Sequence, residues 1–253
     1  MKNIWIMLLL VCSACAFTAC NDDDKTEPQT PKRLAKMISS APNGTTSEYV
    51  LTYKDKQIET IKLVTKGEGE ESLETTYKVK QAENKVTMDN GSDAFVYTLK
   101  DGKVSGSNVY ETDYRWEYDA EGFLASVIGI YPGEEEGQEP TEEEVLKYVY
   151  SKDKNLDEIS GPGLEFGTAK NVVNGVDLVV CIYRFFLTAM NDEDFFPHLL
   201  GLCGNSSANL PIASNAMYGN APITYTWEEW GGVKSITYTS EEEVSTLVFE
   251  YED

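Results

Sequence analysis

The sequence has one histidine, few cysteines and far fewer basic than acidic residues. With His198 as the only histidine, a zinc site made of several histidines is excluded, and so is a Ser-His-Asp triad built at any other position. Because Pro197 and Leu199 flank it, we expect His198 to be a packed or capping residue. The 21 Lys and Arg face 43 Asp and Glu, which gives a net charge of −22. Such a surface repels nucleic acid and anionic lipids, so neither is an expected partner.

Long hydrophobic runs are also missing, since a bilayer-spanning helix needs about 20 apolar residues. The N-terminal apolar stretch at residues 4–11 is too short, but it follows Lys2 and precedes small residues, as in a signal peptide. Thr-Ala directly before Cys20 is typical of a bacterial lipoprotein cleavage site. We therefore predict a signal peptide at residues 1–19 and a lipid on Cys20, with an ordinary signal peptide and a chance cysteine as the alternative.

The segment that follows Cys20 is polar and acidic. Residues 20–31 contain Asp22, Asp23, Asp24 and two prolines and nothing that could enter a core, which predicts a flexible tether. An acidic cluster at this place resembles the surface-export signal of Bacteroidota lipoproteins. This predicts an outer-membrane lipoprotein that faces the extracellular side and touches the membrane through its lipid anchor only.

From about residue 47 onward, short aromatic and β-branched runs alternate with turn signals. Residues 95–99 lead into Asp101-Gly102, and residues 114–118 lead through another Asp- and Gly-containing turn into residues 123–130. Period-two apolar patterns joined by such turns are typical of hairpins. We therefore predict that residues 32–253 form a single all-β domain, an antiparallel hairpin meander that makes a curved or barrel-like sheet.

The strand pattern also indicates which solvent surrounds the sheet. Tyr114, Trp116 and Tyr118 share one face, whereas Arg115 and Glu117 point to the other. A transmembrane barrel needs an uncharged band facing lipid around its whole circumference. Charges in the middle of strands therefore predict a sheet surrounded by water.

Two segments interrupt the meander. The Glu-rich residues 134–144 are predicted to form a long solvated hairpin loop. Residues 172–211 include the apolar run 178–187, which is a buried strand or a short helix, and we favour short helical turns packed over the open end of the sheet. Beyond the anchor, only Cys181 and Cys203 remain, too far apart for a CxxC motif; they are either a disulfide or two buried thiols.

Candidate ligand-binding residues are few. Acidic clusters at 68–71, 134–136, 142–144, 192–194 and 241–243 lack the spacing of a calcium loop, so we expect charged, solvated turns. Several aromatic residues could stack on sugar rings, but at strand spacing they normally fill a core. Trp230 differs because it lies in a turn, and it is the ligand-binding candidate. The other aromatic residues considered are Trp116, Trp227, Tyr110 and Tyr131.

The order of lipoprotein signal, acidic tether and hairpin meander occurs together with two further features. Residues 199–211 contain Leu-Gly, Gly, Ser and Asn-Leu-Pro in succession, and residues 225–251 form a closing aromatic hairpin. In these features residues 32–253 resemble a family of Bacteroidota lipoproteins with a domain of unknown function described as having a porin-like β fold. The family's usual Asp-Gly turn in the last hairpin is replaced by residues 229–232. The resemblance implies a fold but no activity and no catalytic residues.

Function is thus predicted only in outline. The leading hypothesis is a non-catalytic binding or envelope-structural module, with a glycan, another small ligand or a protein as partner. The alternative is a hydrolase of extracellular glycans that uses two carboxylates about 5–10 Å apart. No cofactor, metal site or catalytic residue is predicted.

Overall fold

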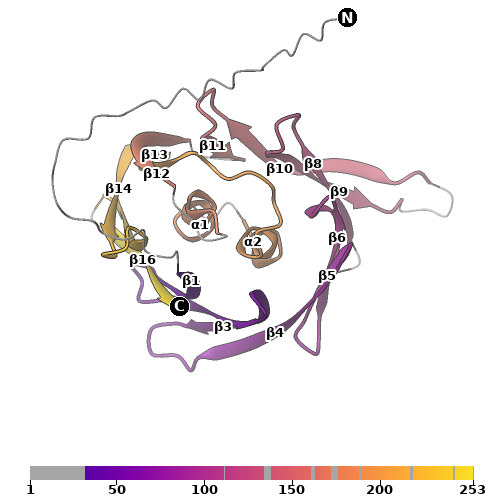
Figure 1. Cartoon of the computed structure of the whole chain (residues 1–253), viewed down its shortest axis with the longest axis horizontal. Coiled ribbons are helices and arrows are strands. Elements are labelled where there is room, and N and C mark those ends of the chain that lie inside the picture. The colour runs from indigo at the N-terminus through magenta and orange to yellow at the C-terminus, as the bar shows by residue number, and fades with distance from the viewer. Residues whose placement is uncertain are drawn as a thin grey trace, which may run out of the picture. The chain divides into compact units, whose positions relative to one another are not determined.

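The folded part of the chain is one antiparallel sheet that surrounds two helices. The computed structural model describes residues 32–110, 112–133, 138–160, 163–171, 176–187, 190–216, 219–241 and 243–252. Residues Pro31–Asp253 form one compact unit, and its sheet has 16 strands. Figure 1 shows this sheet rolled into a ring with α1 and α2 inside it. The predicted all-β, barrel-like meander with a helical interruption is confirmed.

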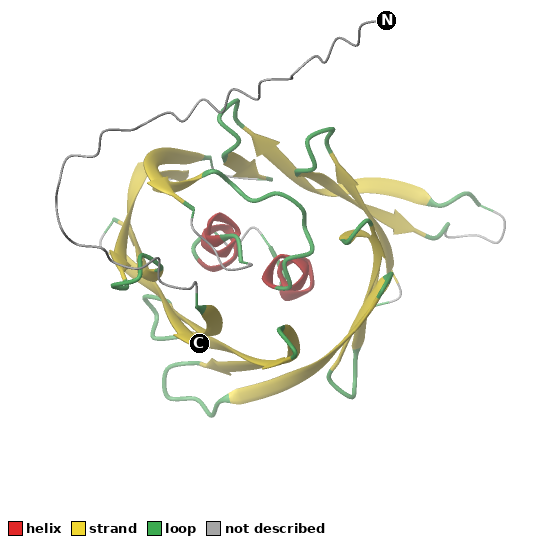
Figure 2. Cartoon of the chain, in the orientation of Figure 1, coloured by secondary structure: helices red, strands yellow, loops and turns green. Residues whose placement is uncertain are grey.

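The elements follow one another as hairpins, except where the two helices intervene (Figure 2). The helices are α1 (Leu178–Phe185) and α2 (Asp192–Leu199). The strands are β1 (Arg33–Ser40), β2 (Thr46–Lys54), β3 (Gln57–Lys66), β4 (Leu73–Ala82), β5 (Lys85–Asp89), β6 (Ala94–Lys100), β7 (Lys103–Val109), β8 (Thr112–Tyr118), β9 (Leu124–Tyr131), β10 (Thr141–Tyr150), β11 (Leu156–Ile159), β12 (Leu164–Lys170), β13 (Asn209–Ala216), β14 (Gly219–Trp227), β15 (Val233–Ser240) and β16 (Glu243–Glu252).

The first strand of the chain pairs with the last strand in the middle of the sheet. β1 pairs with β2 on one side and with β16 on the other, where Met37 lies opposite Phe249. The hydrogen-bonded order runs from β11 down to β1 and then from β16 down to β12. β11 and β12 are therefore the edges of a nearly closed ring.

The period-two pattern sends apolar side chains inward and charged side chains outward. In β4, Tyr77 and Val79 are buried, whereas Lys78 and Lys80 are exposed. Tight turns keep this register: Asp101 (φ 53°) and Gly102 (φ 76°) form a two-residue loop between β6 and β7. The most deeply buried inner-face side chains include Tyr49, Ile61, Val86, Met88, Phe95, Tyr97, Leu247 and Phe249.

The helices fill the interior of the ring. Residues Leu178–Tyr183 of α1 are all buried, which is typical of a helix surrounded by protein on every side. Asp177 caps α1 by accepting a hydrogen bond from the Val179 N–H at 3.0 Å. In α2, Phe196 packs against sheet residues, and burying one such ring contributes about 1.5–3 kcal/mol. The prediction of helical turns is confirmed, but their predicted place over the end of the sheet is wrong (Figure 1).

Residues 200–208, which follow α2, cover one end of the ring along its β7–β11 side. The Leu202 carbonyl accepts a hydrogen bond from the Val104 N–H at 3.0 Å. The Ser207 hydroxyl accepts one from the Leu156 N–H at 3.1 Å. Gly204 has a φ of +82°, and a Cβ there would lie 2.4 Å from a backbone carbonyl oxygen, so only glycine fits. We call this the sealed end; the turns after β2, β4, β6, β8 and β10 surround it.

Part of the Glu-rich segment forms a strand where a loop was predicted. Thr141–Tyr150 form β10, so Glu142–Glu144 are strand residues paired with β9. Glu142 lies on the outer face, where it accepts two hydrogen bonds from Arg115 of β8. The hairpin prediction holds, but the loop is shorter because cross-strand ion pairs compensate for the repulsion between neighbouring glutamates.

Candidate functional site

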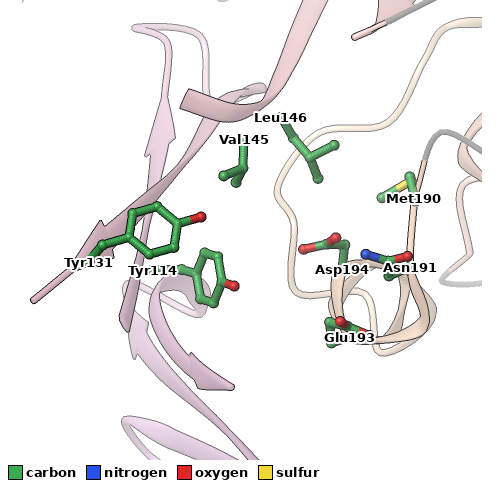
Figure 3. Close-up of a pocket in the computed structure, with 8 residues that line it drawn as sticks. All are labelled: Tyr114, Tyr131, Val145, Leu146, Met190, Asn191, Glu193 and Asp194. Carbon is green, nitrogen blue, oxygen red and sulfur yellow. The ribbon is translucent and has the colours of Figure 1, made fainter. Parts of the chain in front are cut away.

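A cavity of about 430 Å³ lies between the sheet and the N-terminus of α2, towards the end opposite the sealed end. Part of its lining comes from β8, β9 and β10, and the rest from residues 190–194. Figure 3 shows two tyrosine rings on one side of this cavity and carboxylate and amide groups on the other. We call it the Tyr114–Asp194 pocket. It is lined by Tyr114, Tyr131, Val145, Leu146, Met190, Asn191, Glu193 and Asp194.

The tyrosine wall depends on a glycine. A Cβ on Gly129 would lie 2.9 Å from atoms of the Tyr131 ring, so this glycine lets the ring lie over β9. On β8, burial raises the pKa of Tyr114, and the neighbouring Tyr131, Asp194 and Glu193 raise it further. The Tyr114 hydroxyl therefore stays protonated near neutral pH and is able to donate a hydrogen bond to a ligand.

The carboxylate wall is the first turn of α2. Asn191 is the N-cap residue, and Asp192, Glu193 and Asp194 follow it. Acidic residues are favoured here because the N-terminus of a helix carries partial positive charge. Asp194 also accepts a hydrogen bond from the backbone N–H of Asn191, which is half of a capping box.

The three acidic residues have different roles. Arg184 of α1 donates a hydrogen bond to Asp192 at 2.8 Å, and the Tyr49 hydroxyl donates another. The backbone carbonyl of Glu193 accepts a hydrogen bond from Tyr97 at 2.8 Å, which ties α2 to the sheet. The prediction that this cluster is a solvated turn is therefore wrong: its first carboxylate is paired inside the barrel, and the next two line the pocket.

Asp194 is the most perturbed carboxyl group of the pocket. Burial raises its pKa from 3.8 to about 7, and the adjacent charge of Glu193 adds to the rise. The hydrogen bond from Asn191 and the charge of Arg184 lower the pKa but do not offset the burial. Near neutral pH this group is therefore divided between its charged and its neutral form.

A second polar cluster lies near the sealed end and includes Asp177, His198 and Cys203. These residue types resemble a nucleophilic triad, but all three side chains are buried, and the adjoining cavity of about 20 Å³ has room for about one water molecule. Burial lowers the pKa of His198 to about 3 and raises that of Cys203. The Tyr148 hydroxyl lies 3.3 Å from His198 Nε2. His198 is a packed residue, as predicted, and Asp177 accepts hydrogen bonds from the backbone N–H groups of Val179 and Ser207.

Of the two residues singled out from the sequence, only Trp230 belongs to the described structure. Cys20 lies outside the described residues. Trp230 lies at the sealed end, where its ring covers Gly232 and packs edge-on against Tyr251 with centroids 4.9 Å apart. It does not line the Tyr114–Asp194 pocket, and a role in ligand binding stays a prediction. Trp116 is a core residue that donates a hydrogen bond to another side chain in the wall.

Among the remaining aromatic candidates, Tyr131 lines the pocket. Tyr110 lies at the same end of the ring and is 65% exposed, whereas Trp227 is 45% exposed at the sealed end. Sequence reasoning missed Glu193 and Asp194 as pocket residues. The signal was present: Asn191 followed by three acidic residues and an apolar pair is typical of a helix N-terminus.

The cysteines and acidic clusters provide no metal site in the described structure. Cys181 and Cys203 are free, buried thiols, which decides between the two predicted alternatives. Within the described ranges, no group of three or more His, Cys, Asp or Glu side chains is arranged to hold a metal ion. None of the helices in those ranges is long and apolar enough to cross a membrane.

Comparisons with known proteins identify the fold. No protein-family model matches the chain, and no curated protein matches it by sequence. Among solved structures, the chain is similar to a porin-like protein from Bacteroides uniformis ATCC 8492, with a TM-score of 0.58 and 16% sequence identity. The similarity covers 89% of this chain and all of that protein's chain. At this identity the similarity shows a shared porin-like β fold.

Proposed function

We propose that this chain is a lipid-anchored binding module of the outer membrane, with a water-surrounded barrel that binds a small polar ligand without catalysis. The observation that carries the proposal is the Tyr114–Asp194 pocket, in which tyrosine rings face carboxylate and amide groups across about 430 Å³. Pockets of a few hundred Å³ with an apolar wall and a few convergent polar groups are typical of small-molecule sites.

The distribution of apolar and charged residues supports a barrel in water. Transmembrane barrels have an apolar outer band and a polar interior, and this barrel has the reverse arrangement. Its interior is filled by apolar side chains of α1 and α2. Its outer face carries cross-strand ion pairs such as Lys62–Glu74 at 2.8 Å and Arg115–Glu142 at 2.7 Å. Burying such charges in lipid would be costly.

The proposed anchor and location rest on the sequence, and the fold is compatible with them. The chain enters the barrel at Arg33, the first residue of β1, which lies at the sealed end. We propose that the module faces the extracellular side.

The pocket geometry favours binding over hydrolysis. A glycosidase places two carboxyl groups on either side of the scissile bond. In this pocket Glu193 and Asp194 are neighbours on one helical turn, and the opposite wall consists of Tyr114 and Tyr131 (Figure 3). The raised pKa of Asp194 is the one observation that favours the hydrolase alternative.

A ligand screen with a pocket variant tests the proposal. All described elements belong to the unit Pro31–Asp253, so a soluble chain that begins at residue 21 keeps the whole core. We expect a screen of sugars, amines and polyols to find ligands that raise the melting temperature. Tyr114→Ala should abolish the increase, whereas Tyr110→Ala, at the same end but outside the pocket, should not. Ligand binding unaffected by Tyr114→Ala contradicts the proposal.

The anchor has a separate test. Cys20→Ala should give a chain that carries no lipid and is released from the membrane fraction. If the Cys20→Ala protein is still acylated and membrane-associated, the proposed anchor is wrong.

A further inference from the structure

We propose that the ligand of the Tyr114–Asp194 pocket is a cation with a primary ammonium group. This inference rests on the proposed binding function and specifies the class of ligand. It is carried by the lining of the pocket and by an uneven distribution of charge between the two ends of the barrel.

The lining of the pocket has negative charge and no basic side chain among its described residues. Glu193 and Asp194 supply carboxylates, and Asn191 supplies an amide. Arg184, an interior cation whose charge acts on Asp194, is paired with Asp192 at 2.8 Å. A charged carboxylate that has lost water is stabilised by a cation brought to it, and a neutral ligand does not provide this compensation.

The tyrosine wall suits the same ligand. An ammonium group has hydrogen-bond donors only, and the oxygen of a tyrosine hydroxyl group can accept a hydrogen bond from it. The hydroxyl ends of Tyr114 and Tyr131 point across the cavity towards the acidic wall (Figure 3). An ammonium group placed between the two walls would therefore have carboxylates on one side and tyrosine hydroxyl groups on the other.

The charge of the barrel ends is an independent observation. At the end near the pocket, the described residues of the turns after β1, β3, β5, β7, β9 and β15 include no lysine or arginine. Their acidic residues are Glu68, Glu70, Glu71, Asp93, Glu139 and Glu241. The adjoining strand ends there add Lys66, Asp89 and Glu243. At the sealed end the two signs nearly balance: the turns and adjoining strand ends carry Lys54, Lys56, Lys85, Lys100, Lys103, Lys152 and Lys154 together with Asp55, Glu83, Asp101, Asp119, Glu121, Asp153, Glu228 and Glu229.

This arrangement gives the barrel a field along its axis. Clustered charge of one sign raises the local concentration and the association rate of ligands of the opposite sign. The acidic turns lie at the same end as the pocket, so they attract small cations to it and repel anionic ligands. The lining and the field therefore select the same sign of charge.

Matched ligand pairs test the inference by calorimetric titration of the soluble chain. Glucosamine is compared with glucose, and putrescine with 1,4-butanediol, because the members of each pair differ in the ammonium group. We expect the amine of at least one pair to bind about tenfold or more tightly than its neutral partner. A preference for glucosamine over glucose indicates an amino sugar as ligand. A preference for putrescine over 1,4-butanediol indicates an aliphatic amine, such as a polyamine or a lysine side chain.

Charge-removing variants complete the design. Asp194→Asn and Glu193→Gln should each weaken amine binding by about tenfold. Glu71→Gln is the control, because it removes the same charge from an exposed turn at the same end of the barrel. It should change amine binding less than about threefold, since solvent screens a surface charge. Melting curves confirm that each variant is folded. If each neutral ligand binds as tightly as its amine partner, and Asp194→Asn does not change the affinity of either, the cation assignment is overturned and the proposed binding function is not. No binding of any amine or neutral ligand overturns both.

Discussion

Replacing Asp194 by asparagine tests the electrostatics of the pocket without a ligand. Asparagine has nearly the same shape and can still accept the hydrogen bond from the Asn191 N–H, so the helix cap is preserved. The variant removes a carboxyl group whose pKa is raised from 3.8 to about 7, chiefly by burial. Such a rise corresponds to about 4 kcal/mol, and partial exposure to solvent reduces the expected effect to about 2–4 kcal/mol.

The sign follows from proton linkage. A carboxyl group with a raised pKa binds its proton more tightly in the folded state, so its contribution to stability is complete below about pH 4 and is lost as pH rises through about 7. We therefore expect Asp194→Asn to match the unmodified chain near pH 4 and to exceed it in stability by about 2–4 kcal/mol above pH 8. Urea unfolding of both chains between pH 4 and 9 measures this difference.

The neighbouring acidic residue is the comparator. Asp192→Asn removes the charged partner of Arg184 and should lower stability by about 1–3 kcal/mol at neutral pH. The two substitutions are chemically identical and lie two residues apart, yet the predicted effects have opposite signs. A stability difference for Asp194→Asn that stays constant with pH, or a loss of stability above pH 8, would refute the reasoning.

Three further predictions concern the interior. Phe196→Ala should lower the free energy of unfolding by about 3–5 kcal/mol in urea titrations, because it leaves a cavity inside the barrel. A loss below about 1 kcal/mol would contradict the close packing of Phe196 against the sheet. Ser207→Ala should cost about 1–3 kcal/mol, because the buried Leu156 N–H loses its acceptor, and a neutral effect would count against this seal. In a chain starting at residue 21, a thiol reagent at pH 8 should leave Cys181 and Cys203 unmodified until urea unfolds the protein, since both are buried and their pKa values are raised.

The sheet could be predicted from the sequence because each hairpin is specified locally. Alternation at residues 114–118 sends Trp116 into the core, and the glycine-containing turn that follows starts the next strand. Asp101-Gly102 supplies the positive φ angles that a two-residue loop requires. Outward charges such as Arg115 also followed from the pattern. Short-range rules are sufficient for these features.

The position of the helices and the pocket could not be predicted, because both depend on long-range closure. The apolar run that forms α1 is interrupted only by Arg184, so its pattern indicates burial without saying where. Tyr114 and Tyr131 meet Glu193 and Asp194 only because the sheet closes around α2. The altered pKa of Asp194 is equally invisible in the sequence, since burial causes most of it.

The central claim is that the Tyr114–Asp194 pocket is where this protein binds its ligand. Met190 lines the pocket, whereas Met37 and Met88 are fully buried in the sheet. With methionine methyl groups labelled with carbon-13, titration with a ligand found in the screen should move the Met190 resonance in a saturable way and leave the resonances of Met37 and Met88 in place. A ligand that binds with an unchanged Met190 resonance would contradict the account.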